Sequence, residues 1–355
     1  MGAMAQIEMT ARGGAIALLA LWIVVILRRH RTERAALGVA GLALGVICHL
    51  LSIMPGLLLG SIPLNVVVEA GSGIAGTLFW LMALLWFDDG ERRLGPPLAL
   101  VALSAVLPTI FALDEVRVID APMAILGPIW RAQTFLFAGA GLWIAWRGRA
   151  DDLVEGRRKL RVALIWSVGL YVALVNLVEI AIFQAGAPYE LRSLLVVGIA
   201  VLTFVIVSVT LGVRDADLFG PLQRRPAERV RADDAESDAL AGRLTALMAA
   251  EKPWRDETLT VAALAARLGV PEYRLRRLIN GHLGHRNFAT YLNGFRLDEV
   301  EQALADPAQR EVPILTIALD SGFGSLAPFN RAFRERFGLT PTEFRQKRLI
   351  DSGIA

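Results

Sequence analysis

The pattern of hydrophobic and polar positions divides the chain into two halves of different character. Up to Gly212 the sequence consists of long apolar runs separated by short charged stretches. From Arg214 onward, apolar residues recur at helical spacing among mixed charges. An apolar run of about 20 residues crosses the ~30 Å hydrocarbon core of a bilayer as a helix. We therefore expect a bundle of membrane-spanning helices followed by a helical soluble domain.

Seven apolar runs in the first half are predicted to be transmembrane helices. They cover residues 13–27, 35–54, 62–87, 96–113, 123–146, 162–185 and 191–212. Arginines and lysines are concentrated in the first, third and fifth connecting loops. Because loops rich in basic residues stay on the cytoplasmic side, the N-terminus is predicted to lie outside and the C-terminus in the cytoplasm.

Composition supports this division and argues against several classes of protein and of binding site. The chain is 55% hydrophobic and 20% charged, which is too apolar for an ordinary soluble protein of 355 residues. Its formal net charge of +3 is small, so nucleic-acid binding would depend on local clusters of basic residues. The single cysteine, Cys48, excludes an intramolecular disulfide and a cysteine zinc site. No catalytic spacing is evident, so we expect neither an enzyme nor a bound cofactor.

Ionisable residues inside the apolar runs are costly in hydrocarbon and usually functional. Four of them, from four different runs, lie roughly 8–12 Å below the outer ends of their helices at ~1.5 Å of rise per residue. With two neighbouring asparagines they predict a ligand-binding pocket, whose members are His49, Asn65, Glu69, Arg131, Asn176 and Glu179. Two alternatives stay open: Arg131 pairs with the glutamates only to hold helices together, or His49 and the carboxylates bind a metal, which the nearby arginine disfavours.

Small residues and a charged segment mark two further features. Gly38, Gly41 and Gly45 form a face that allows close helix packing, either within the bundle or in a homodimer. Residues 213–237 are rich in charge and poor in apolar residues, which is typical of a connector. The predicted domains are a membrane domain over residues 1–212, this connector, and a soluble domain over residues 238–355.

Two segments of the soluble half have the pattern of a helix-turn-helix motif. In the first, Gly269 provides a tight turn and Leu275 lies on the buried face of the second helix. In the second, Gly322 provides the turn and Phe329 marks the buried face. A long helix over about 287–305 joins them. Such motifs place their second helix in the major groove of DNA.

Residues from about 240 to 348 resemble the C-terminal domain of AraC/XylS-type bacterial transcription regulators. The resemblance rests on Leu264, Ala265, Leu275, Arg277, Tyr291, Leu292, Arg296, Leu297, Ile317, Ala318, Gly322, Phe323, Ser325, Phe329, Arg331, Phe333, Gly338, Pro341 and Arg345. It implies two three-helix units joined by the long helix, with both recognition helices in successive major grooves. It does not cover residues 1–236.

The resemblance assigns a DNA-binding surface to both motifs by position. Its members are Tyr273, Arg274, Arg276, Arg277, Ser325, Leu326, Asn330, Arg331 and Arg334. Arginine is suited to guanine and asparagine to adenine. Leu326 departs from the polar residue usual at its place, which shifts the expected specificity toward the first motif. Lys252, Arg286, Arg296 and Arg345 are expected to be phosphate contacts or solvated charges.

Together these features predict an all-helical regulator with seven spans in the bacterial inner membrane. Its bundle senses a ligand or a membrane signal, and its cytoplasmic domain binds promoter DNA. The expected partners are double-stranded DNA, membrane lipid, RNA polymerase, a second copy in a homodimer and an unidentified small ligand. Two other functions stay open: a transporter or membrane enzyme with a fused regulatory domain, and a passive anchor and dimeriser.

Overall fold

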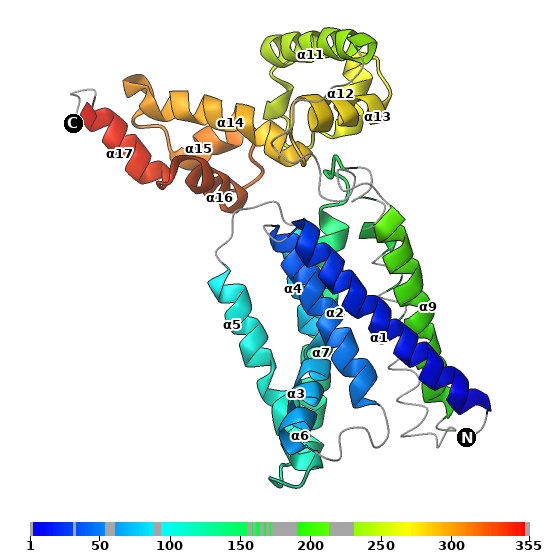
Figure 1. Cartoon of the computed structure of the whole chain (residues 1–355). Coiled ribbons are helices and arrows are strands. Elements are labelled where there is room, and N and C mark those ends of the chain that lie inside the picture. Colours follow the sequence, from blue (N-terminus) through cyan, green and yellow to red (C-terminus); the bar gives the residue numbers. More distant parts are fainter. Residues whose placement is uncertain are drawn as a thin grey trace. The chain divides into compact units, whose positions relative to one another are not determined.

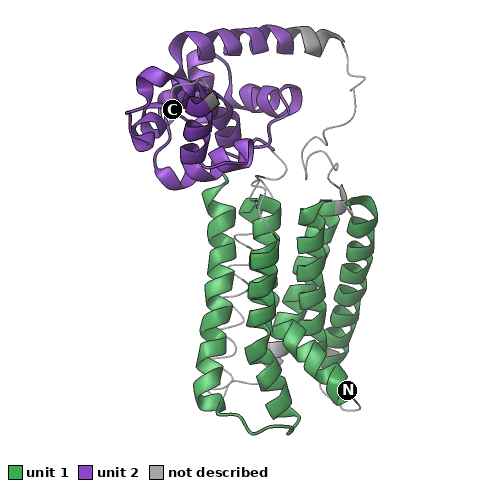
Figure 2. Ribbon diagram, turned by 90° about the vertical axis from the view of Figure 1, so that its left-hand side faces the viewer, with its two compact units in different colours: residues 1–149, 159–214 green, residues 150–158, 215–355 purple. Residues whose placement is uncertain are grey.

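A computed structural model of the chain describes residues 3–30, 33–53, 61–87, 94–154, 158, 161–163, 167, 171, 190–212 and 231–351. Across these residues the secondary structure is helical, and strands are limited to one isolated antiparallel bridge between Asp152 and Asn287. The chain divides into two compact units (Figure 2), residues 1–149 with 159–214 and residues 150–158 with 215–355. The all-helical class is confirmed for the described residues. Residues 150–158 belong to the second unit although the sequence places them in the apolar half.

The first unit is a bundle of apolar helices (Figure 1). Its described helices are α1 (Ala3–His30), α2 (Arg34–Ser52), α3 (Ile62–Gly73), α4 (Ala75–Phe87), α5 (Gly95–Ser104), α6 (Val106–Glu115), α7 (Met123–Arg147) and α9 (Glu190–Gly212). Every predicted run except the sixth coincides with one of these helices or with a consecutive pair. The sixth run, 162–185, lies almost entirely outside the described residues.

Three stretches of the described chain are long and apolar enough to cross a membrane, namely Met4–His30, Arg34–Ser52 and Gly95–Glu115. The pair Ile62–Gly73 and Ala75–Phe87 is a fourth candidate, bent by 53°. At the bend, the Trp130 indole N–H donates a hydrogen bond of 3.3 Å to the carbonyl oxygen of Gly73. This donor satisfies a carbonyl group near the interruption of the helix. Three to four spans are therefore supported, and the count of seven stays a prediction.

Glycines bring α2 and α4 together inside this unit. A side chain at Gly38 would lie 2.9 Å from the Cα atom of Met82, and one at Gly45 would lie 2.8 Å from a methyl group of Leu78. Gly38 thus requires a residue without a Cβ atom for the observed approach of the helices, because its neighbour is a backbone atom. At Gly45 the neighbour is the end of a flexible side chain, so the position faces α4 closely without the same requirement. Two of the three small residues in the second run therefore serve packing within the bundle.

The second unit consists of two helical subdomains that share one long helix. Its elements are α11 (Arg231–Glu251), η1 (Pro253–Arg255), α12 (Val261–Leu268), α13 (Glu272–Arg277), η2 (Leu278–His282), α14 (Phe288–Ala305), η3 (Pro307–Gln309), α15 (Ile314–Asp320), α16 (Leu326–Phe337) and α17 (Pro341–Asp351). The long helix α14 contributes Leu292 to the core of the first subdomain and Val300 to the core of the second. In Figure 1, α11–α13 lie toward one end of α14 and α15–α17 toward the other. The first described helix, α11, begins at Arg231, inside the predicted connector.

Candidate nucleic-acid interface

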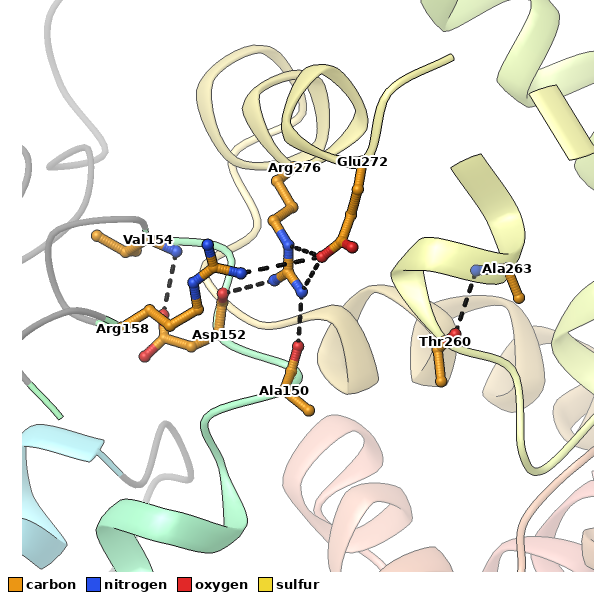
Figure 3. A network of polar contacts seen from close by, with 8 residues as sticks. All are labelled: Ala150, Asp152, Val154, Arg158, Thr260, Ala263, Glu272 and Arg276. Atoms are coloured by element: carbon orange, nitrogen blue, oxygen red, sulfur yellow. Dashed lines mark hydrogen bonds and ion pairs between the residues drawn. The ribbon is translucent and has the colours of Figure 1, made fainter. Parts of the chain in front are cut away.

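The first motif is formed by α12 and α13, joined by a tight turn. The side-chain oxygen of Thr260 caps α12 by accepting a hydrogen bond of 3.1 Å from the Ala263 amide (Figure 3). Gly269 ends the helix with a φ angle of +66°, a left-handed conformation that glycine adopts without a steric penalty. Leu264 and Leu275 are fully buried in the same core. The predicted turn and buried faces are confirmed.

The solvent-facing side of α13 carries three of the four predicted DNA contacts of this motif. The side chain of Tyr273 is 61% exposed, and Arg274 and Arg277 are exposed as well. Arg276 was expected to face outward with them but is only 8% exposed. That expectation is wrong for the observed conformation, because the Arg276 guanidinium donates hydrogen bonds to the carbonyl oxygens of Ala150 and Asp152.

The second motif is formed by α15 and α16. Its turn contains Gly322 at a φ angle of +94°, and Ser325 occupies the N-cap position of α16 without a side-chain capping bond. Phe329 and Phe333 are fully buried. The predicted DNA contacts of this motif are all exposed: Ser325, Leu326, Asn330, Arg331 and Arg334. The motif thus separates a buried aromatic face from an exposed polar and basic face, as the sequence pattern predicts.

Arg296 is a structural residue and not the solvated charge or phosphate contact that the sequence indicated. It is 8% exposed, and its guanidinium donates hydrogen bonds to the carbonyl oxygens of Trp254 at 2.7 Å and Asp256 at 3.0 Å. Burial lowers the pKa of this arginine. From the same helix, Glu299 accepts hydrogen bonds from Trp254 and Arg255, and the contact with Arg255 lowers the pKa of the glutamate. Helix α14 therefore holds the η1 segment in place.

Residues 150–154 pack against the first motif, although no motif in the sequence pointed to them. Leu153 is 4% exposed and belongs to the same core as Leu264 and Leu275. A signal was present, because Leu153 and Val154 are an apolar pair inside a strongly charged loop. Position in the sequence, between two apolar runs, had assigned the loop to the membrane half.

The first unit contains a cavity of about 280 Å³ lined mainly by apolar side chains of α1, α2, α4, α7 and α9. One corner is polar. There, Nδ1 of His49 lies 3.1 Å from the hydroxyl of Ser72, and its Nε2 lies 3.5 Å from the hydroxyl of Tyr171. The volume is near the lower end of the range for small-molecule sites.

The predicted ligand pocket is only partly reproduced. Among its described members, His49 lines the cavity, whereas Asn65 and Glu69 are half-buried on α3 and Arg131 is exposed on α7. The remaining two members, Asn176 and Glu179, lie outside the described residues. Within the described part of the chain, no three His, Cys, Asp or Glu side chains gather as a metal site would require. The polar partners of His49 are hydroxyl groups that the sequence reasoning did not select.

Comparison with known proteins relates the C-terminal part of the chain to bacterial regulators. Residues 264–347 match a family described as helix-turn-helix domain. The HTH-type transcriptional regulator CdhR of Pseudomonas aeruginosa is 37% identical over 87 residues, which are 24% of this chain and 25% of that protein. The right origin-binding protein of Escherichia coli is 34% identical over 91 residues, 26% of this chain and 30% of that protein. No solved structure matches the chain.

A shorter relative is covered over most of its length. The probable transcription factor PqrA of Proteus vulgaris is 32% identical over 92 residues, which are 26% of this chain and 72% of that protein. By contrast, the match spans less than a third of the length of CdhR and of the origin-binding protein. By their names, CdhR is a transcriptional regulator and PqrA a probable transcription factor. The family match runs from within α12 to within α17, and it includes the turns and second helices of both motifs. The chain belongs to the AraC family of helix-turn-helix transcription regulators.

Proposed function

We propose that this protein is a one-component transcription regulator embedded in the bacterial inner membrane. The observation that carries the proposal is the presence, in one chain, of a unit of long apolar helices and a unit with two helix-turn-helix motifs. The apolar unit senses a ligand or a membrane signal, and the second unit binds promoter DNA sequence-specifically and contacts RNA polymerase. The chain acts as a homodimer, so that two copies bind paired sites.

The proposed DNA contacts come from the exposed faces of α13 and α16. Arg277 and Arg331 match guanine, and Asn330 matches adenine. The remaining exposed members are Tyr273, Arg274, Ser325, Leu326 and Arg334. Helix α14 has 18 residues and spans roughly 27 Å. This length is compatible with two recognition helices in successive major grooves, which are about 34 Å apart.

Membrane topology is tested by reporter fusions. Seven spans with the N-terminus outside predict that a reporter active only in the cytoplasm is active when fused after Arg93 and after Ala355. Arg93 ends the basic part of the third loop, and Ala355 follows all seven predicted spans. The same reporter fused after Ile119 is expected to be inactive. A fusion after Ala355 that is active only with a reporter requiring the outer side would contradict the proposal.

Signal sensing is assigned to the cavity of the first unit. Its apolar walls and the polar corner of His49, Ser72 and Tyr171 favour a small amphiphilic molecule with one hydrogen-bonding group. The polar group would replace or bridge the contacts of the His49 ring, and the apolar part would fill the space between the helices.

Filling the cavity is expected to displace this molecule. Ala138 is 3% exposed and lines the cavity, so Ala138→Phe removes the space that the ligand occupies. Native mass spectrometry of the full chain released from membranes is expected to show a bound small molecule, which this variant loses. Ala132→Phe is the matched control, since Ala132 is exposed on the same helix. Equal retention by both variants would place the ligand elsewhere.

A further inference from the structure

Residues 150–154 form backbone contacts with the start of the long helix of the DNA-binding unit. The Leu153 amide donates a hydrogen bond of 3.0 Å to the carbonyl oxygen of Arg286, and the Phe288 amide donates one of 2.9 Å to the carbonyl oxygen of Asp151. Asp152 and Asn287 form an antiparallel bridge between these bonds. This two-sided pairing gives the segment one defined register against the start of α14.

Side chains of the same segment are buried. Asp152 is inaccessible to solvent, and Leu153 and Val154 are 4% and 3% exposed. The Asp152 carboxylate accepts a hydrogen bond of 3.0 Å from the Val154 amide, which fixes the turn of the chain after the bridge. Burial of this extent in a loop of a charged segment indicates a docked element and not a passing connection.

The docked segment also engages a residue of the recognition helix. Arg276 donates hydrogen bonds to the carbonyl oxygen of Asp152 at 2.8 Å and to that of Ala150 at 2.9 Å, and its Nε donates to the Glu272 carboxylate at 2.6 Å (Figure 3). Arg158 lies 3.9 Å from the same carboxylate. An arginine reads guanine with two parallel N–H donors. In this conformation, donors on all three nitrogens of Arg276 are occupied by protein oxygens.

The segment is connected almost directly to the membrane unit. Helix α7 ends at Arg147, and only Gly148 and Arg149 separate it from Ala150. A displacement of the end of α7 along or across the bilayer would therefore pull on the docked residues. A two-residue connection leaves little slack to absorb such a movement.

We propose that residues 150–154 are an intramolecular lock on the first motif, which holds Arg276 away from DNA until a movement of α7 releases it. This inference rests on the proposed function and adds its mode of regulation. Specific DNA competes with the segment for Arg276, so binding of DNA and docking of the segment oppose each other. The opposite role, in which the segment only completes the core around Leu153, predicts that docking favours DNA binding.

A reversible disulfide between the facing residues of the bridge tests the lock. Opposed residues in an antiparallel pair have Cα atoms about 4.5–5.5 Å apart, within the range of about 4.4–6.8 Å that a disulfide spans. The variant is the full chain with Asp152→Cys and Asn287→Cys in a Cys48→Ala background, which leaves no other thiol. The probe is a DNA duplex selected from a random-sequence pool by the unmodified chain in detergent micelles.

We expect the oxidised protein to bind this duplex at least tenfold more weakly than the same protein after reduction. The oxidised and the reduced protein both lack the Asn287 side chain that caps α14. The loss of this cap therefore does not affect the comparison between them. The single variant Asp152→Cys is the control and should be insensitive to reductant. Leu153→Ala, which weakens docking, is expected to bind the duplex more tightly than the unmodified chain.

Three other outcomes would each contradict a different part of the proposal. Equal or tighter binding in the oxidised state, with Leu153→Ala binding more weakly, would show that the segment supports the DNA-bound conformation. Failure of the two cysteines to form a disulfide would show that the segment is not docked. If the unmodified chain selects no duplex at all, the proposed DNA-binding function is contradicted. The lock depends on that function and is then contradicted with it.

Discussion

Replacing Gly322 with alanine is expected to lower the free energy of unfolding of the DNA-binding unit by about 3–5 kcal/mol. The φ angle of +94° at this position is unfavourable for any residue with a Cβ atom. In addition, a Cβ atom here would overlap the carbonyl oxygen of Trp254 and lie 2.8 Å from the Cα atom of Arg255. These neighbours are backbone atoms of the η1 segment, which Arg296 holds in place, so they have little freedom to move.

Gly269→Ala is the matched control. This glycine also has a positive φ angle, +66°, but a Cβ atom would meet nothing within 4 Å. Only the conformational cost of about 1–2 kcal/mol then applies. Hydrogen–deuterium exchange of the full chain measures both variants. Amides of α14–α16 should exchange roughly 150–5,000 times faster in Gly322→Ala, at about 1.36 kcal/mol per factor of ten. Similar exchange in the two variants would show that the second motif does not pack against η1 in solution.

The second large effect is expected in DNA recognition. Arg277→Ala and Arg331→Ala should each weaken binding to a selected duplex by about 1–3 kcal/mol, or roughly 5–150-fold. Both side chains are exposed on the second helix of their motif, so their removal leaves the core intact. The loss should be confined to cognate DNA, because a guanine contact contributes nothing to binding of unrelated sequences. Fluorescence anisotropy with cognate and scrambled duplexes measures the difference.

Arg286→Ala distinguishes base contacts from phosphate contacts. We expect this variant to weaken binding to all sequences alike and to reduce the dependence of log affinity on log salt concentration by about one unit. Arg336→Ala is a further control, since Arg336 is exposed on α16 but is engaged with Gly294 and Asp298 within the protein. Unchanged affinity of both Arg277→Ala and Arg331→Ala for cognate DNA would mean that the recognition faces are assigned to the wrong residues.

Local sequence patterns were sufficient for the helical elements and for both motifs. Gly269 and Gly322 marked the turns because few other residues adopt a positive φ angle, and the spacing of Leu275 and Phe329 marked the buried faces. These features depend on residues within a few positions of one another. The apolar runs likewise predicted the helices of the first unit, although length and composition in the described residues support three to four spans and not seven.

The tertiary structure alone decided which polar residues are available for binding. Arg276 and Arg296 look like exposed arginines on helices, yet each is buried by carbonyl oxygens from residues 40 or more positions away in the sequence, at Asp152 and Trp254. His49 similarly has its partners, Ser72 and Tyr171, 23 and 122 positions away in the sequence. Periodicity shows which side of a helix is apolar, but it contains no information about a distant segment whose backbone satisfies a buried charge. That is why the sequence determined the family and the helices of this protein, whereas the docked segment and the cavity required the fold.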